Sequence, residues 1–314
     1  MPAPVGADHI SAIVNRHLMD DVVDLAYTGN PLFFRIYNSN RRFIEGGYQI
    51  EQPVIAYQFT AGGSFSELEP LNMAPQDTER SAAWGWKEKY VPVVFSNLSL
   101  VKMDTSESIA NGVQIRVEQA AMMMREHLGT DLYSDGTNPK DVEGLRLAIA
   151  TTGIYGGWDR SSATWFAGVL TAGAALGTDF TLLQNYWSAA TRGGKNPTIG
   201  ITTQVIYNKI LTIAQAKTQY HVNTNEKDTV LANAGFHNVL YNGTPLVIDP
   251  KCPSGDLYWL TEDFIKLAVS PRSDFFMEPF QRAYNQAGIG TKLLFTGNLL
   301  VTAPAVQHRV TGVS

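Results

Sequence analysis

The sequence is poor in cysteine: of its 314 residues, only Cys252 is one. A single cysteine excludes a disulfide within the chain and a thiolate metal cluster. Long hydrophobic runs are also lacking, since no apolar stretch approaches the roughly 18 residues that a membrane-spanning helix needs. The first residues do not combine a basic start with an apolar core, so we expect no secretory signal and synthesis in the cytoplasm. Folding then depends on packing, or on further copies of the chain.

Positive charge is in short supply as well. The chain carries a formal net charge of −5, which gives it no general attraction for polyphosphate. This excludes a protein that grips nucleic acid through a basic surface. Hydrophobic residues make up 44% of the chain and charged residues 17%, as expected for a globular protein with a substantial core in one large or two ordinary domains.

The common catalytic and cofactor motifs are missing. The chain has no phosphate-binding GxxxxGK[ST], no GxSxG and no HExxH. Its six histidines lie in separate predicted elements, and no histidine is near Cys252 in the sequence. Two turns separate His9 and His17, which is too far for a shared metal. We therefore predict no catalytic residue, no bound cofactor and no metal ligand.

One stretch, "GGWDRSSATWF" (156–166), needs a choice between two interpretations. Asp159 and Arg160 could be a catalytic acid and its electrostatic partner, in a carbohydrate-active hydrolase that also uses a distant carboxylate. Neighbouring residues usually point apart, however, and the flanking glycines and serines favour a tight loop whose charges satisfy the local backbone. We predict a structural loop, with Trp158 and Trp165 packed against the rest of the chain or at a subunit contact.

Along the chain, residues 8–26 place apolar side chains at helical spacing with three aspartates on the other side, which predicts an amphipathic helix. Two strands follow, one carrying Pro53 and one carrying Pro92. Internal prolines restrict strands to edges or two-stranded ribbons. Between them, residues 61–81 show no periodicity, and so long a connection is usually functional or flexible.

The clearest predicted helix covers residues 105–128. Asp104 is placed to cap it, and Gly129 is expected to end it. Its apolar stripe includes Met124, whereas Met122 and Met123 either fill gaps or mark a soft surface for a partner. At 1.5 Å per residue the helix is roughly 36 Å long, and we expect a sheet to lie across it.

From about residue 139 to 268 the pattern is a mixture of helices and strands, including a hairpin that turns at Asn242 and Gly243. This predicts a compact second domain. The C-terminal residues predict two strands around Gly297 and Asn298 and a third after Pro304. We expect all three to complete the sheet beside the long helix.

A two-stranded ribbon is marginal in water by itself. The ribbon and the N-terminal helix therefore need a surface that one copy of the chain does not offer. No internal repeat is available to supply it, so the economical partner is a neighbouring copy.

This order of elements resembles the major capsid proteins of tailed bacteriophages, which have the HK-97-like fold. The strings that carry the resemblance are "GGSFSELEPLNMAPQDTERSAAWGWKEKYVPVVFS" (62–96), "TNPKDVEGLRLAI" (137–149), "NGTPLVIDPKCPSGDLYWL" (242–260) and "LLFTGNLLVTAPAVQHRVTGV" (293–313). The fold class it implies is α+β, with five parts: an N-terminal arm (1–40), an extended two-stranded loop (41–95), the first part of a peripheral domain with a long spine helix (96–138), an α/β axial domain (139–268) and the second part of the peripheral domain (269–314).

The resemblance also implies sites. The extended loop would lie over an adjacent subunit, through Gly62, Gly63, Phe65, Leu71, Met73, Arg80, Trp84 and Trp86. Glycines that tolerate wide backbone change are candidate pivots during shell expansion, namely Gly46, Gly47, Gly129 and the pair at 62–63. Some family members cross-link neighbours through a lysine on the extended loop. Residues 60–80 here hold no lysine, and the nearest are Lys87 and Lys89, so we expect no cross-link. Some family members also carry a long N-terminal scaffolding region that is later removed. Only residues 1–40 precede the loop here, so we expect a separate scaffolding protein, or none, and little proteolytic maturation.

The function implied is that of a shell subunit assembling into pentamers and hexamers of an icosahedral phage head around double-stranded DNA. Its partners would be other copies of itself, a portal, separate scaffolding and decoration proteins, and DNA contacted without sequence preference, with no membrane. It would assemble in the host cytoplasm and reside in the virion. The alternatives are an encapsulin-type nanocompartment of the same fold and, as a different class, the hydrolase described above.

Overall fold

The computed structural model describes residues 29–314 except 59, 61, 68–70, 72–73, 103–105, 178–179, 218–237 and 283–286. Two sequence predictions lie outside the described residues: the helix over residues 8–26, and Asp104 as the cap of the long helix. Within the described part, no helix combines the length and apolar character needed to cross a membrane.

The first of two large sheets is built around one long strand, and it corrects the prediction for the C-terminus. Its six strands are β1 (Arg41–Phe43), β12 (Ile265–Val269), β15 (Gly288–Val301), β13 (Phe276–Met277), β14 (Gln281–Arg282) and β4 (Lys87–Ser96). The sequence predicted two strands around Gly297 and Asn298, but both residues lie inside the single strand β15. Gly297 pairs with Val269 of β12 and with Lys87 of β4. A Cβ at Gly297 would lie 2.5 Å from the Ala268 carbonyl oxygen, so glycine serves close strand packing here and not a turn.

The prediction for the two prolines is confirmed. In the described structure β4, which carries Pro92, pairs only with β15 and so lies at the edge of its sheet. Pro53 lies in β2 (Ile50–Ile55), which pairs with β3 (Glu79–Trp84) to form a two-stranded sheet of its own. In both places the missing N–H is tolerated because one side of the strand needs no ladder partner.

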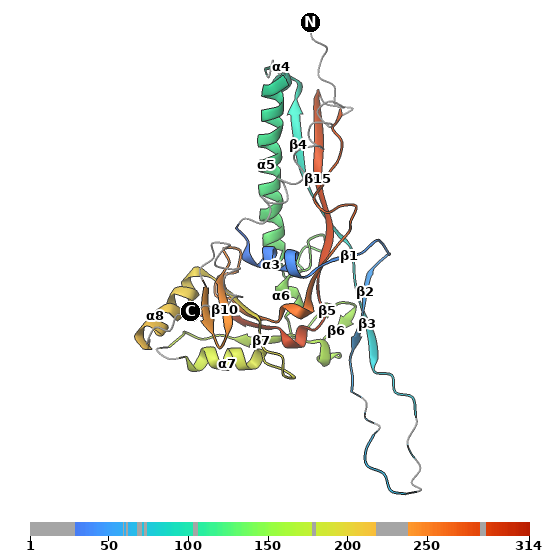
Figure 1. The fold of residues 1–314 in the computed structure, drawn as a ribbon, viewed down its shortest axis with the longest axis vertical. Helices are drawn as coiled ribbons and strands as arrows, with labels where there is room; N and C mark the ends of the chain where they lie inside the picture. Colours follow the sequence, from blue (N-terminus) through green and yellow to red (C-terminus); the bar gives the residue numbers. More distant parts are fainter. Residues whose placement is uncertain are drawn as a thin grey trace.

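The long helix α5 (Ser106–Asp131) lies against the first sheet, as expected. It buries Val113, Val117, Ala120, Met124 and Leu128, the stripe that its periodicity predicts. In Figure 1 it stands beside β4 and β15, with the short α4 (Asn97–Lys102) at its upper end.

The helix does not end at Gly129, contrary to the prediction, but continues to Asp131. A Cβ at Gly129 would lie 2.3 Å from the Asn30 side-chain amide nitrogen. Asn30 caps α3 (Pro31–Ser39), a helix that precedes α5 in the chain, by accepting a hydrogen bond from the Phe33 N–H at 3.1 Å. Glycine at position 129 thus lets this cap approach the long helix. Gly129 is buried inside the helix, and its role as a pivot stays a prediction.

The second sheet and two helices form the broader part of the molecule in Figure 1. The strand order is β7 (Val169–Ala172), β16 (His308–Thr311), β11 (Leu257–Leu260), β8 (Ile199–Thr202), β10 (Thr244–Ile248) and β9 (Asn238–Tyr241). The helices are α7 (Thr181–Ala190) and α8 (Gln204–Lys217). The hairpin is confirmed, because Asn242 and Gly243 join β9 to β10 with φ angles of 49° and 77°.

The sequence predicted that the strand after Pro304 joins the sheet beside the long helix. In the structure it lies in this second sheet instead. As β16 it pairs with β7 in parallel and with β11 in antiparallel orientation. The buried His308 ring fixes it further, with Nδ1 2.8 Å from the Tyr186 carbonyl oxygen and Nε2 2.9 Å from the Thr171 hydroxyl. Since a carbonyl only accepts, Nδ1 carries the proton.

The two sheets share one hydrophobic core. Phe95 of β4, Leu128 of α5 and Leu260 of β11 belong to a single cluster of buried residues, which also includes residues of α6 (Leu145–Ala148). Tyr133, just after α5, donates a hydrogen bond to Asp249 at 2.8 Å. A smaller cluster lies between the second sheet and its two helices. The division into peripheral and axial domains remains a prediction, and the parts it separates are packed together.

Candidate interaction site: the ribbon and its anchoring loop

The ribbon, which we define as β2, β3 and the connecting residues 56–78, projects away from both sheets in Figure 1. Among its described connecting residues there is no helix or strand. Phe65 and Leu71 of this connection are 66% and 58% exposed. No atom lies within 4 Å of a Cβ built on Gly62 or Gly63. These exposed apolar side chains lie on a projecting segment, where they are accessible to a partner. Met73 lies outside the described residues.

The root of the ribbon, in contrast, is packed within its own chain. Trp84 is buried, and its ring lies 5.8 Å from that of Tyr155 in an edge-to-face arrangement. Trp86 donates a hydrogen bond from Nε1 to the Gly47 carbonyl oxygen at 2.9 Å. Arg80 pairs with Asp77. Trp84 is therefore covered by its own chain, and the contact surface proposed below does not include it.

Residues 153–166, which we call the anchoring loop, hold this root in place. The loop begins as a small hairpin of β5 (Ile154–Tyr155) and β6 (Trp158–Asp159). The Ala83 N–H donates to the Gly156 carbonyl oxygen at 3.0 Å, and Trp158 Nε1 donates to the Ser81 carbonyl oxygen at 2.9 Å. Both bonds reach β3. The direction in which the ribbon leaves the molecule is thus fixed from this loop.

Aromatic side chains extend the contact. The Trp165 ring lies 6.2 Å from that of Tyr57, on the ribbon, and 5.8 Å from that of Trp158. Gly156 has a φ of 57°, and a Cβ there would lie 3.2 Å from the rings of Trp84 and Phe166. A glycine is required at this position on both counts. Trp158 and Trp165 are partly buried against their own chain, and their contact with the ribbon was not predicted.

Arg160 and Asp159 make hydrogen bonds with the local backbone. Arg160 is 1% exposed and donates to three carbonyl oxygens: Gly153 at 3.1 Å, Leu147 at 2.7 Å and Ala148 at 3.1 Å. Burial lowers the pKa of this guanidinium below its ordinary value, against the raising effects of Tyr155 and Asp159. Asp159 is exposed and accepts a hydrogen bond from the Ser161 N–H at 2.9 Å. The pair closes the loop on itself.

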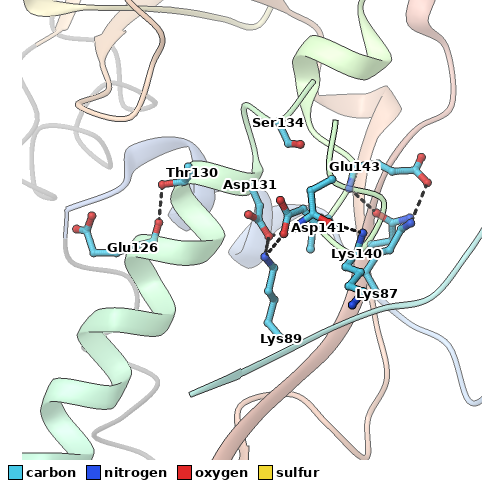
Figure 2. A network of polar contacts seen from close by, with 12 residues as sticks. Lys87, Lys89, Glu126, Thr130, Asp131, Ser134, Lys140, Asp141 and Glu143 are labelled. Carbon is cyan, nitrogen blue, oxygen red and sulfur yellow. Dashed lines mark hydrogen bonds and ion pairs between the residues drawn. The ribbon is translucent and has the colours of Figure 1, made fainter. Parts of the chain in front are cut away.

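The two lysines nearest the extended loop are engaged within their own chain, as Figure 2 shows. Lys89 Nζ lies 2.9 Å from Asp131, at the end of α5, and 2.5 Å from Asp141. Burial disfavours the charge of Lys89, but hydrogen bonds to these carboxylates outweigh it and raise its pKa. Lys87 donates to the Pro139 carbonyl oxygen at 2.6 Å and lies 3.9 Å from Glu143. The network ties the start of β4 to the end of the long helix.

The remaining site predictions concern pivots and ligands. Gly46 and Gly47 lie between β1 and β2 with φ angles of 139° and 115°, next to the ribbon root, and their role as pivots stays a prediction. Among the described residues, no group of three or more potential ligands could hold a metal ion. Cys252 is buried, and burial raises the pKa of its thiol.

Comparison with known proteins defines the fold. No protein-family model and no curated protein matches the chain, whereas many solved structures do. They show that the chain has the α+β HK-97-like capsid fold.

Three of these structures illustrate the range of sequence identity and structural similarity. A chain of the cyanophage A-1(L) capsid asymmetric unit is 17% identical, with a TM-score of 0.67 over 90% of this chain and 92% of that one. A chain from Mycobacterium phage Bobi is 13% identical, with a TM-score of 0.58 over 99% of both chains. A chain of the holo-SrpI encapsulin complex from Synechococcus elongatus is 12% identical, with a TM-score of 0.56 over 90% of this chain and 88% of that one.

Proposed function

We propose that this chain is the major capsid protein of a tailed phage and assembles into the icosahedral shell of its head. The observation that carries the proposal is the ribbon: its root is fixed by the anchoring loop, and its far part presents Phe65 and Leu71 to solvent. A rigidly aimed segment with exposed apolar side chains gains its stabilisation when another copy covers it. The similarity to the cyanophage capsid structure supports the same function.

In this proposal the partners are further copies of the chain, arranged as pentamers and hexamers, with a portal and with separate scaffolding and decoration proteins. The contact surface consists of Gly62, Gly63, Phe65, Leu71, Met73 and Arg80 on one copy, with Trp86 at its base. The shell assembles in the host cytoplasm, becomes the virion capsid, and surrounds double-stranded DNA without reading its sequence. The net charge of −5 suits a wall that does not hold DNA tightly.

The role is structural and not enzymatic. Support comes from the anchoring loop, where Asp159 caps a local turn and Arg160 is occupied by three carbonyl oxygens. An acid whose electrostatic partner is buried elsewhere is poorly placed for glycoside hydrolysis.

An encapsulin-type compartment is the second candidate, favoured by the likeness to the Synechococcus elongatus encapsulin. The two functions share the fold and differ in what the shell encloses. Particles purified from an infected or lysogenic host decide between them: nuclease-protected double-stranded DNA supports the capsid, and an enclosed enzyme without DNA supports the compartment. Negative-stain images of the purified chain test the shared premise. Closed shells are expected, and a folded chain that stays monomeric at high concentration contradicts both.

A further inference from the structure

The ribbon differs from the rest of the chain in its charge. Between Arg42 and Arg80 the sequence holds no lysine or arginine and six acidic residues: Glu45, Glu51, Glu67, Glu69, Asp77 and Glu79. This stretch has a formal charge of −6, whereas the whole chain has −5. The rest of the chain is therefore close to neutral. A surface that covers the ribbon gains from positive charge as well as from apolar contact.

The first sheet has an uncovered apolar face. Arg116 of α5 lies over the Phe95 ring at 4.5 Å, so Phe95 and the buried Val91 point toward the helix. Because side chains alternate along a strand, Tyr90 and Val94 of β4 point to the opposite face. They are 67% and 51% exposed. Together with residues of β14 and β15 they line a groove of about 410 Å³.

A glycine of β15 deepens this groove. Gly290 pairs with Val94 across the sheet, and it has no side chain to fill the space beside it. The three atoms nearest to a Cβ built on Gly290 all belong to β4, starting with a Val94 methyl group at 3.5 Å. Since Tyr90 and Val94 are also exposed, no described part of the chain closes the groove.

The rim of the groove carries more basic than acidic side chains. Its charged lining residues are Arg282, Lys292 and Glu278. Arg282 of β14 is exposed. Lys292 Nζ lies 3.2 Å from Glu278, and the lysine side chain is 48% exposed. An apolar floor with a basic rim matches the exposed Phe65 and the acidic residues of the ribbon.

The ribbon of the same copy does not reach this groove. In Figure 1, whose longest axis is vertical, β4 and β15 extend upward from the level of the ribbon root, and the ribbon projects downward. Lys87 begins β4, and Val94 lies seven strand residues further on, about 23 Å. The groove and the ribbon connection thus lie on opposite sides of the root. A ribbon that fills the groove has to come from another copy.

We propose that the groove receives residues 56–78 of the ribbon of a second copy, with Phe65 and Leu71 against Tyr90 and Val94 and the acidic side chains beside the basic rim. This inference rests on the proposed shell function and names the surface that the ribbon meets. The contact is heterologous, because each copy gives one ribbon and receives another. Contacts of this kind close into rings.

A photo-crosslinker on the ribbon tests the contact in the full chain. A Phe65→benzoylphenylalanine variant is co-assembled with excess wild-type chain and irradiated. Covalent dimers are expected, with the link within residues 90–96, 278–282 or 287–292 of the second copy, located by mass spectrometry. The matched control, Ile154→benzoylphenylalanine, replaces an exposed side chain outside the ribbon and should not link to those residues.

The outcomes separate this inference from the proposed function. Shells that give links elsewhere on the second copy, or that give no dimers, would overturn the groove contact and leave the shell function standing. A wild-type chain that forms no shells would contradict the proposed function, and the groove contact with it.

Charge reversal provides a second measurement. Arg282→Glu should raise the chain concentration needed for shell assembly about tenfold, because like charges then face each other across the contact. Adding Glu67→Arg to the same chain should restore part of the loss, which a folding defect would not allow. The control Arg192→Glu reverses an exposed cation between α7 and β8 and should change the concentration less than about twofold. Equal effects of the two single reversals, or no rescue by Glu67→Arg, would overturn the proposal.

Discussion

Replacing Arg160 by methionine removes the centre of the anchoring loop while keeping a long side chain. Three carbonyl oxygens lose the donor that the side chain supplies, those of Gly153, Leu147 and Ala148, although the Gly153 oxygen still accepts from the backbone N–H of residue 160. Each net hydrogen bond contributes about 1 kcal/mol. Relief from burying a charge offsets part of the loss, and the carbonyls left unpaired increase it. We expect the free energy of unfolding to fall by about 3 kcal/mol, which lowers Tm by about 5 °C in a chain of this size.

The assay is thermal unfolding of the unassembled chain, followed by circular dichroism. Asp159→Asn is the matched control, because an amide oxygen can still accept from the Ser161 N–H and the side chain is exposed. It should change stability by no more than about 0.5 kcal/mol. If Arg160→Met unfolded at the wild-type temperature, or if Asp159→Asn cost as much, the structural account of this loop would be wrong.

Two further predictions concern packing and pH. Gly129→Ala should destabilise the chain by about 1–2 kcal/mol, since its Cβ would displace the helix cap at Asn30. The control Gly63→Ala should change stability little, because there is open space around Gly63. Equal losses of stability in denaturant titrations of the two variants would refute this. Burial lowers the pKa of His308, so the unfolded chain binds that proton more readily and stability falls as pH drops below about 6.5. His308→Gln should reduce the fall in Tm between about pH 7.5 and about pH 5.5, while exposed His127→Gln should not, and an unchanged fall in the His308 variant would contradict this.

Local patterns in the sequence predicted the elements with strong signals. The buried stripe of α5 follows from its 3.6-residue period, and the β9–β10 hairpin follows from Asn242 and Gly243, whose positive φ angles suit that turn. The restriction of Pro53 and Pro92 to a ribbon and an edge follows from the missing N–H. In these places the residues that carry the signal and the backbone structure that they require lie within a few residues of each other.

The predictions that were wrong depend on contacts distant in sequence. Gly129 and Gly297 were interpreted as a helix end and a turn, but each makes room for a distant backbone or side chain, Asn30 in one case and Ala268 in the other. Strand β16 joins the second sheet through β7, more than 130 residues earlier. No local pattern distinguishes a glycine needed for close approach from one needed for a turn.

The candidate site was predicted in part. The sequence indicated a structural loop around Asp159, and a ribbon that one copy cannot cover. It did not show that the loop anchors the ribbon, because the bonds from Trp158 to Ser81 and from Ala83 to Gly156 join segments more than 70 residues apart. Repeated aromatic residues in both segments, Tyr57 and Trp165 among them, were the signal available.

The central claim is that the far part of the ribbon is completed by another copy of the chain. Its most direct test is sedimentation of a Phe65→Ser, Leu71→Ser variant beside an Ile154→Ser control, whose replaced side chain is exposed but lies outside the ribbon. The account predicts that all proteins fold, that wild type and control form shells, and that the double variant stays largely unassembled. Shells formed by the double variant as readily as by the wild type would contradict it.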